Sequence, residues 1–338
     1  MQAEATKNKG LPNAIANGTR RLLAARESGV FLVLVILYVS VWFVSPIFRT
    51  QFNQISILRQ MTVFAVLAIG QTMCIVIGGF DLSQGPVAAL VGVLAGTAIK
   101  TWGWQPLVAI AFGFALSLAC GLFNGFLVTR LRFVPVVSTL ASSSIFSAVL
   151  YGITRGNPAV DLPPAYTWLG SGEVGPIPAG VVVMFVLYVI MHLVLTTSVF
   201  GRQVFLVGAN KEAARLAGID VERTQFAVFT ISAVLAGLSG IILAGRISAA
   251  VPTMGSNLML PTVAAAVVGG TWLSGGVGSM AGTLMGAAVM AIIRNAVVVL
   301  RVDLYLQEFV IGVATLLAVV LDLFRRGHLS LRSLRRGR

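Results

Sequence analysis

The stretch GGFDLSQG, residues 78–85, interrupts the most apolar part of this chain. Asp81 is the only charged residue between Arg59 and Lys100, and glycines lie on both sides of it. As a single helix, the 40 residues 60–99 would reach about 60 Å, because an α-helix rises about 1.5 Å per residue. The hydrocarbon core of a bilayer is only about 30 Å thick. The stretch therefore predicts two membrane crossings with a break at GGFDLSQG.

The composition of the whole chain supports a membrane protein. Of its 338 residues, 57% are hydrophobic and 10% are charged, and the mean hydropathy is +0.93. A soluble domain is typically about 45–50% apolar and about 25% charged. The net charge of +13 does not point to a nucleic-acid partner, because the basic residues cluster at the termini and in short breaks between apolar runs. We expect an all-α polytopic membrane protein.

Apolar runs of sufficient length predict about ten transmembrane helices. They fall at 30–48, twice within 60–99, and at 106–129, 134–153, 179–197, 224–244, twice within 247–293, and 304–324. With both termini inside, 17 of the 24 Lys and Arg residues lie on the inner side, so we expect a multi-pass protein with cytoplasmic termini. The transmembrane domain would then be 30–324, between an N-terminal segment 1–29 and a basic tail 325–338.

Two connecting loops are long enough to have a role of their own. The outer loop 154–178 contains five prolines and is either a stiff connector or a docking surface. In the inner loop 198–223, Asn210 is suited to cap a short helix, Glu212 lies in its first turn, and Gly218 can end it. So short a helix is marginal alone in water, so we expect it to dock on a partner protein. The alternative is a connector lying on the membrane surface.

A second Gly-rich stretch, GGTWLSGG at 269–276, matches GGFDLSQG at five of eight positions. Matched breaks in two halves of a transporter point to its central pathway. The alignment places Asp81 opposite Trp272, and these two are the predicted pathway residues. The alternative for Asp81 is that it or Ser83 caps the next helix. The predicted helix-break and capping residues are Gly78, Gly79, Ser83 and Gly85 in the first copy, and Gly269, Gly270, Ser274 and Gly276 in the second.

The sequence offers no catalytic or metal-binding pattern. It has no Walker phosphate-binding loop, and its only histidines, His192 and His328, are too far apart to form a local metal pair. Asp81, Glu308 and Asp322 alone give thin support for proton coupling. A pore that takes its energy from a separate subunit fits these residues better, so we expect no catalytic residues, no metal and no cofactor in this chain.

Several motifs in the same order resemble the permease subunit of bacterial ABC importers of the ribose and related monosaccharide class. They are GGFDLSQG (78–85), FNGFLVTRLRFVPVVSTL (123–140), GRQVFLVGANKEAARLAGI (201–219), VVGGTWLSGGVGSMAGTLMGA (267–287) and ATLLAVVLD (314–322). The resemblance covers nearly the whole chain from residue 60 onward. Gln84, Pro86 and Trp272 depart from the usual pattern of that class, which leaves the particular sugar open.

The resemblance implies a dimer of permeases in the bacterial inner membrane, with cytoplasmic ATPase subunits that use the ATP and a periplasmic sugar-binding protein. It also implies that the short helix of the inner loop is the coupling helix that fits the ATPase. Its residues would be Gly208, Asn210, Glu212, Ala213, Ala214, Arg215 and Gly218. The expected function is import of a monosaccharide; the alternative is a secondary carrier or facilitator that works without an ATPase.

Overall fold

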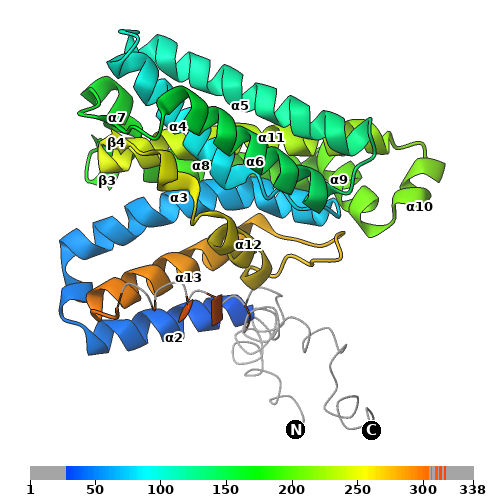
Figure 1. Ribbon diagram of the computed structural model, residues 1–338. Coiled ribbons are helices and arrows are strands. Elements are labelled where there is room, and N and C mark those ends of the chain that lie inside the picture. The colour runs from blue at the N-terminus through cyan, green and yellow to red at the C-terminus, as the bar shows by residue number, and fades with distance from the viewer. Residues whose placement is uncertain (1–27, 304–305, 307–308, 311, 314–315, 317–338) are drawn as a thin grey trace, which may run out of the picture.

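The computed structural model describes residues 28–303 together with 306, 309–310, 312–313 and 316 (Figure 1). Within these residues, six helices are long and apolar enough to cross a membrane: α3 (Gln51–Val76), α5 (Pro106–Thr129), α6 (Pro135–Thr154), α8 (Ala179–Thr197), α11 (Val221–Ile247) and α13 (Met280–Val299). Two further apolar helices, α2 (Ser28–Val44) and α4 (Gln84–Lys100), have 17 residues each. The all-α membrane fold is therefore confirmed, whereas a count of ten crossings is not. Most of the predicted span 304–324 and of both terminal segments lies outside the described residues.

Shorter elements connect these helices. They are η1 (Ile47–Arg49), β1 (Ala159–Val160), α7 (Pro164–Ser171), β2 (Glu173–Val174), β3 (Ile177–Pro178), α9 (Val199–Ala209), α10 (Lys211–Leu216), β4 (Ala249–Ala250), η2 (Pro252–Gly255) and α12 (Met259–Val268). The strands form two antiparallel pairs, β1 with β4 and β2 with β3. The loop 154–178 is thus ordered, and Tyr166 of α7 is fully buried, where its hydroxyl donates to the Gly92 carbonyl over 2.7 Å.

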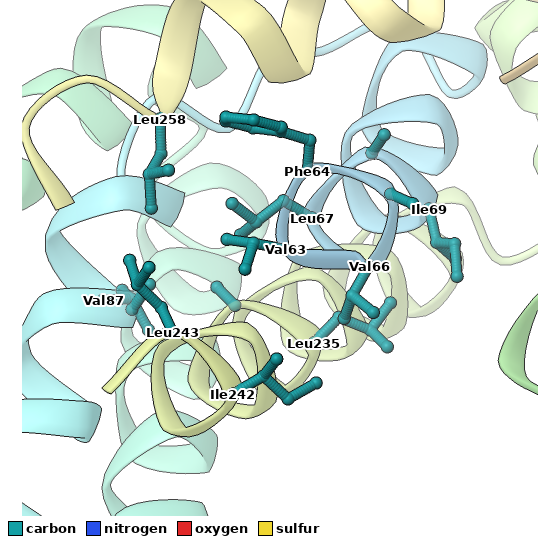
Figure 2. Close-up of a cluster of buried hydrophobic side chains, with 14 of the residues drawn as sticks. Val63, Phe64, Val66, Leu67, Ile69, Val87, Leu235, Ile242, Leu243 and Leu258 are labelled. Atoms are coloured by element: carbon teal, nitrogen blue, oxygen red, sulfur yellow. The ribbon is translucent and has the colours of Figure 1, made fainter. Parts of the chain in front are cut away.

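The core is built around α3 and α11. Every residue of α3 from Met61 to Val76 is buried. Figure 2 shows Val63 and Leu67 of α3 in one buried cluster with Val87 of α4 and with Leu235 and Ile242 of α11. Because lipid tails are as apolar as these side chains, association between helices in a membrane depends on close packing, which small residues permit.

A glycine contact illustrates this packing. The backbone of Gly240 in α11 approaches α4 so closely that a Cβ there would overlap the Ala88 carbonyl. A Cβ at Gly92 would likewise lie 2.6 Å from the Gly240 carbonyl oxygen. The two helices therefore touch backbone to backbone along this line.

The first helix break lies where the sequence predicts it. α3 ends at Val76, and Gly78 has a φ of +84°, a conformation that glycine adopts without steric cost. The Gly78 N–H donates to the Ile75 carbonyl (2.9 Å) and the Gly79 N–H to the Cys74 carbonyl (2.8 Å). This pair of bonds is the Schellman ending of a helix.

The second break has the same geometry, but its residues are offset by one position from those that the sequence alignment pairs. α12 ends at Val268 and Gly270 has a φ of +90°. The Gly270 N–H donates to the Val267 carbonyl (2.9 Å) and the Thr271 N–H to the Ala266 carbonyl (3.0 Å). Gly78 therefore corresponds to Gly270 rather than to Gly269. In this register Trp272 corresponds to Phe80, so the predicted pairing of Trp272 with Asp81 is wrong.

The segment 247–293 does not contain the two complete membrane crossings that the sequence predicts. Its first helix, α12, has ten residues and spans about 15 Å, half of a bilayer core. The preceding residues form β4 and η2, because Pro252 and Gly255 favour a turn over a continuous helix. Only α13 in this segment is long enough to span the membrane.

Candidate functional site at the two helix breaks

Asp81 lies inside the helix bundle, with 1% of its surface exposed. One carboxylate oxygen accepts hydrogen bonds from the Ser83 N–H (3.0 Å) and the Ser83 hydroxyl (2.6 Å). The other accepts from the Ser232 hydroxyl of α11 at 2.7 Å. Both oxygens are therefore bonded within the protein. The Asp81 side chain therefore holds the first break against α11.

The network extends to three more helices. The Gln84 amide of α4 donates to the Ser232 hydroxyl (2.8 Å) and to the Leu67 carbonyl of α3 (3.2 Å). The Asn124 amide of α5 donates to the Ser83 hydroxyl at 2.7 Å. Leu67 lies nine residues before the end of α3, so the Gln84 side chain contacts α3 about 13 Å before that end. The chain thus returns into the bundle before α4 starts.

The two predicted serine caps do not act as caps. Ser83 is at the N-cap position of α4, but its side chain makes no capping hydrogen bond because it is engaged with Asp81 and Asn124. In the second copy, α13 is capped by Ser279, whose hydroxyl accepts from the Gly282 N–H at 3.3 Å. Ser274 lies five residues before this cap. The segment between the break and the next helix differs in length between the two copies. The sequence alignment alone therefore does not show which serine lies at the start of the helix.

Gly85, one of the predicted helix-break residues, lies within helix α4 instead of in the break. It lies in the first turn of α4, where a Cβ would meet the Gly255 carbonyl oxygen of η2 at 2.5 Å. The absence of a side chain on Gly85 and Gly255 lets the start of α4 touch the segment that leads into α12.

The two breaks meet at the end of α9. The Gly276 N–H donates to the Val76 carbonyl, the last residue of α3, at 2.8 Å. A Cβ on Gly208 of α9 would overlap that same carbonyl. A Cβ on Gly275 would lie 2.8 Å from the Gly208 carbonyl oxygen and 3.2 Å from the Gly78 Cα. We call Val76, Gly78, Gly208, Gly275 and Gly276 the glycine junction; it joins both breaks to the inner loop.

The predicted short helix of the inner loop is present as α10, directly after α9. The Asn210 side chain accepts from the Ala213 N–H at 3.0 Å, and Gly218, with a φ of +80°, follows the helix end. Arg215 pairs with Glu212 (3.0 Å) and with Glu222 of α11 (2.7 Å). The hydrogen bond to Glu222 is the main reason that the pKa of the Arg215 guanidinium lies above its usual value.

α10 projects from one end of the bundle (Figure 1). Ala214 is its one buried residue, while Leu216 is 91% exposed. Hydrogen bonds and ion pairs thus fix the shape of α10, and most of its surface remains available to a partner.

A cavity of about 250 Å³ lies between the start of α4, α6 and η2. Leu82 and Pro86 of the first break line it, together with Met259 at the start of α12. Asp81 and Trp272 are not among its lining residues. Sequence reasoning missed this cavity, although Ser143, Ser147 and Tyr151 recur at a spacing of four residues, which places them on one face of a helix. Among the described residues, no group of three or more His, Cys, Asp or Glu side chains is placed to hold a metal ion.

Comparison with known proteins bears on the whole chain. Residues 53–319 match the family described as "Branched-chain amino acid transport system / permease component". A ribose import permease of Bacillus subtilis (strain 168) is 35% identical over 299 residues, which are 88% of this chain and 92% of the relative. The ribose import permease of Escherichia coli (strain K12) is 34% identical, with 90% and 95% covered. An L-arabinose ABC transporter permease of Azospirillum brasilense is 31% identical, with 89% of each chain covered. The chain belongs to this family of ABC transporter permease components.

Proposed function

We propose that the chain is the membrane-spanning subunit of an ATP-driven importer and carries a monosaccharide. The observation that carries this proposal is the alignment with sugar permeases over nearly the full length of both chains. Those relatives are named for ribose and L-arabinose, so the class of solute, a pentose or related sugar, is better supported than any single sugar.

The energy would come from a separate ATPase docked on α10. This helix has a fixed shape and an exposed surface, which are the properties of a docking element. A facilitator working without an ATPase would not need such an element. We further propose that the protein lies in the bacterial inner membrane with cytoplasmic termini, works as a dimer of permeases, and receives sugar from a periplasmic binding protein.

The glycine junction gives a physical route for coupling. Movement of α10 displaces α9, whose Gly208 contacts the end of α3 and both breaks. Since the first break also carries Leu82 and Pro86 of the cavity, a shift at the junction changes the walls of that cavity. In this scheme, alternating access results from movement that passes from α10 to the cavity through residues in direct contact.

The docking role is tested by Glu212→Arg and Gly218→Pro. Glu212→Arg replaces an ion pair with a like-charge contact to Arg215. Gly218→Pro cannot adopt the φ of +80° that ends α10. Both variants should insert into the membrane but lose co-purification with the ATPase or ATP-dependent uptake. Normal co-purification and normal uptake in both would rule out α10 as the coupling helix.

A further inference from the structure

The cavity between α4, α6 and η2 has no assigned role. We propose that it is the solute-binding site of the translocation pathway, and that it accepts a neutral, polyhydroxylated ring of monosaccharide size. This proposal rests on the proposed transport function and adds the site and its chemistry. The volume of about 250 Å³ is just under the lower end of pockets for drug-sized ligands, which fits one sugar ring rather than a chain of them.

Several residues that line the cavity carry hydroxyl groups. Ser143, Ser147 and Tyr151 line it from successive turns of α6, and Ser256 lines it from the segment after η2. Within the part of the chain that the structure describes, the side-chain hydroxyls of Ser147, Tyr151 and Ser256 have no hydrogen-bond partner. Ser143 donates to the Leu140 carbonyl at 2.6 Å and can still accept. These groups can both donate to and accept from the hydroxyls of a sugar.

The rest of the lining is apolar. It is formed by Leu82, Pro86, Ala89, Leu140, Leu150, Pro252, Gly255 and Met259. A sugar ring presents C–H groups as well as hydroxyls, so a lining that mixes apolar side chains with hydroxyl groups matches both parts of its surface. A small number of neutral polar contacts also binds a solute weakly. Weak binding suits a transport site, because the solute must be released.

No charged residue lines the cavity. A branched-chain amino acid would bring an ammonium and a carboxylate into this site, where no charged side chain in the lining can pair with either group. The distinction matters because the family description names amino acids, whereas several relatives are named for sugars. The lining favours the neutral solute.

The position of the cavity supports a pathway role. Leu82 and Pro86 belong to the first helix break, and Ser256 and Met259 lead into the short helix that ends at the second. Solute sites of transporters commonly lie where interrupted helices of two repeats face each other. The cavity is therefore walled by both elements whose movement the glycine junction would control.

Cysteine protection in the assembled complex tests the site. Cys74 and Cys120, the cysteines of the native chain, are both buried, so background labelling by a small thiol reagent should be low. Ser147→Cys and Ser256→Cys place a thiol on two sides of the cavity. Ser144→Cys is the matched control, because it adds the same thiol to α6 at a residue that does not line the cavity. Each variant is reconstituted with its ATPase and binding protein and labelled with and without ribose, L-arabinose, xylose or leucine.

The proposal predicts that a sugar imported by the unmodified complex slows labelling of Ser147→Cys or Ser256→Cys at least threefold. The rate for Ser144→Cys should stay unchanged, and leucine should protect neither position. If sugar is imported but leaves labelling of both cavity variants unchanged, the site is wrong and the transport function stands. If the unmodified complex imports leucine and none of the sugars, both the transport proposal and the site fail.

Discussion

At the scale of single residues, Asp81 acts as an internal acceptor. Its two oxygens receive three hydrogen bonds from Ser83 and Ser232, and the cavity between α4, α6 and η2 is lined by its neighbour Leu82 instead. The sequence shows that a lone carboxylate in an apolar stretch is important, but not in which direction it points. That direction depends on Ser232, which lies 151 residues away and has no recognisable pattern around it.

Asp81→Asn should therefore destabilise the protein rather than change its solute affinity. An amide nitrogen in place of one carboxylate oxygen turns an acceptor into a donor, which leaves a buried hydroxyl mismatched at a cost of about 1–3 kcal/mol. Thermal unfolding of the purified protein should show a lower Tm, with Ser144→Ala as the control. An unchanged Tm combined with lost transport would instead support a pathway role for this carboxylate.

Gly208 is a residue at which the surrounding backbone leaves no room for a side chain. Its predicted role in ATPase coupling came from the family resemblance, whereas the structure shows direct contact with Val76 and Gly275. Gly208→Ala should lower both the Tm and ATP-dependent uptake, because its Cβ has no room beside the Val76 carbonyl. Gly152→Ala is the matched control, since a Cβ there meets nothing within 4 Å. Equal uptake and equal Tm for the two variants would show that the junction does not transmit movement.

At the scale of elements, local signals made α10 predictable. Asn210 and Gly218 mark its two ends through their own backbone preferences, which act without help from the rest of the fold. The breaks after α3 and α12 were predictable for the same reason. The length of α12 was not predicted, because residues 247–268 contain no charged group that could mark a boundary. Pro252 and Gly255 favour a turn there, but the start of α12 at Met259 also depends on packing.

The exposed end of α10 carries a further prediction. Burial of a leucine side chain contributes about 1.5–3 kcal/mol, so Leu216→Ala should weaken ATPase binding by about tenfold or more. The Tm should not change, because Leu216 is almost fully exposed. Titration of the purified subunits against each other measures this effect. Val174→Ala, at an exposed residue in the loop 154–178, should bind the ATPase normally; equal affinity of both variants would show that Leu216 is not part of the interface.

At the scale of the whole molecule, the two helix breaks meet at the glycine junction, and residues beside α4 and α12 line the cavity. The composition of the chain was enough to predict a helical membrane protein, and the repeated Gly-rich stretches were enough to locate its breaks. The cavity itself could not be predicted, because it is formed by α4, α6 and η2 from three separate parts of the sequence. The one-residue shift between Gly78 and Gly270 likewise depends on where each helix ends rather than on matched letters.

The central claim is that this chain moves a sugar only with an ATPase attached to it. The most direct measurement is uptake of labelled ribose, L-arabinose and xylose into proteoliposomes that contain the permease with its binding protein, with or without the ATPase subunits and ATP. We predict uptake of at least one sugar only when both ATPase and ATP are present. Sugar uptake by the permease in the absence of the ATPase would contradict this account and indicate a facilitator or secondary carrier.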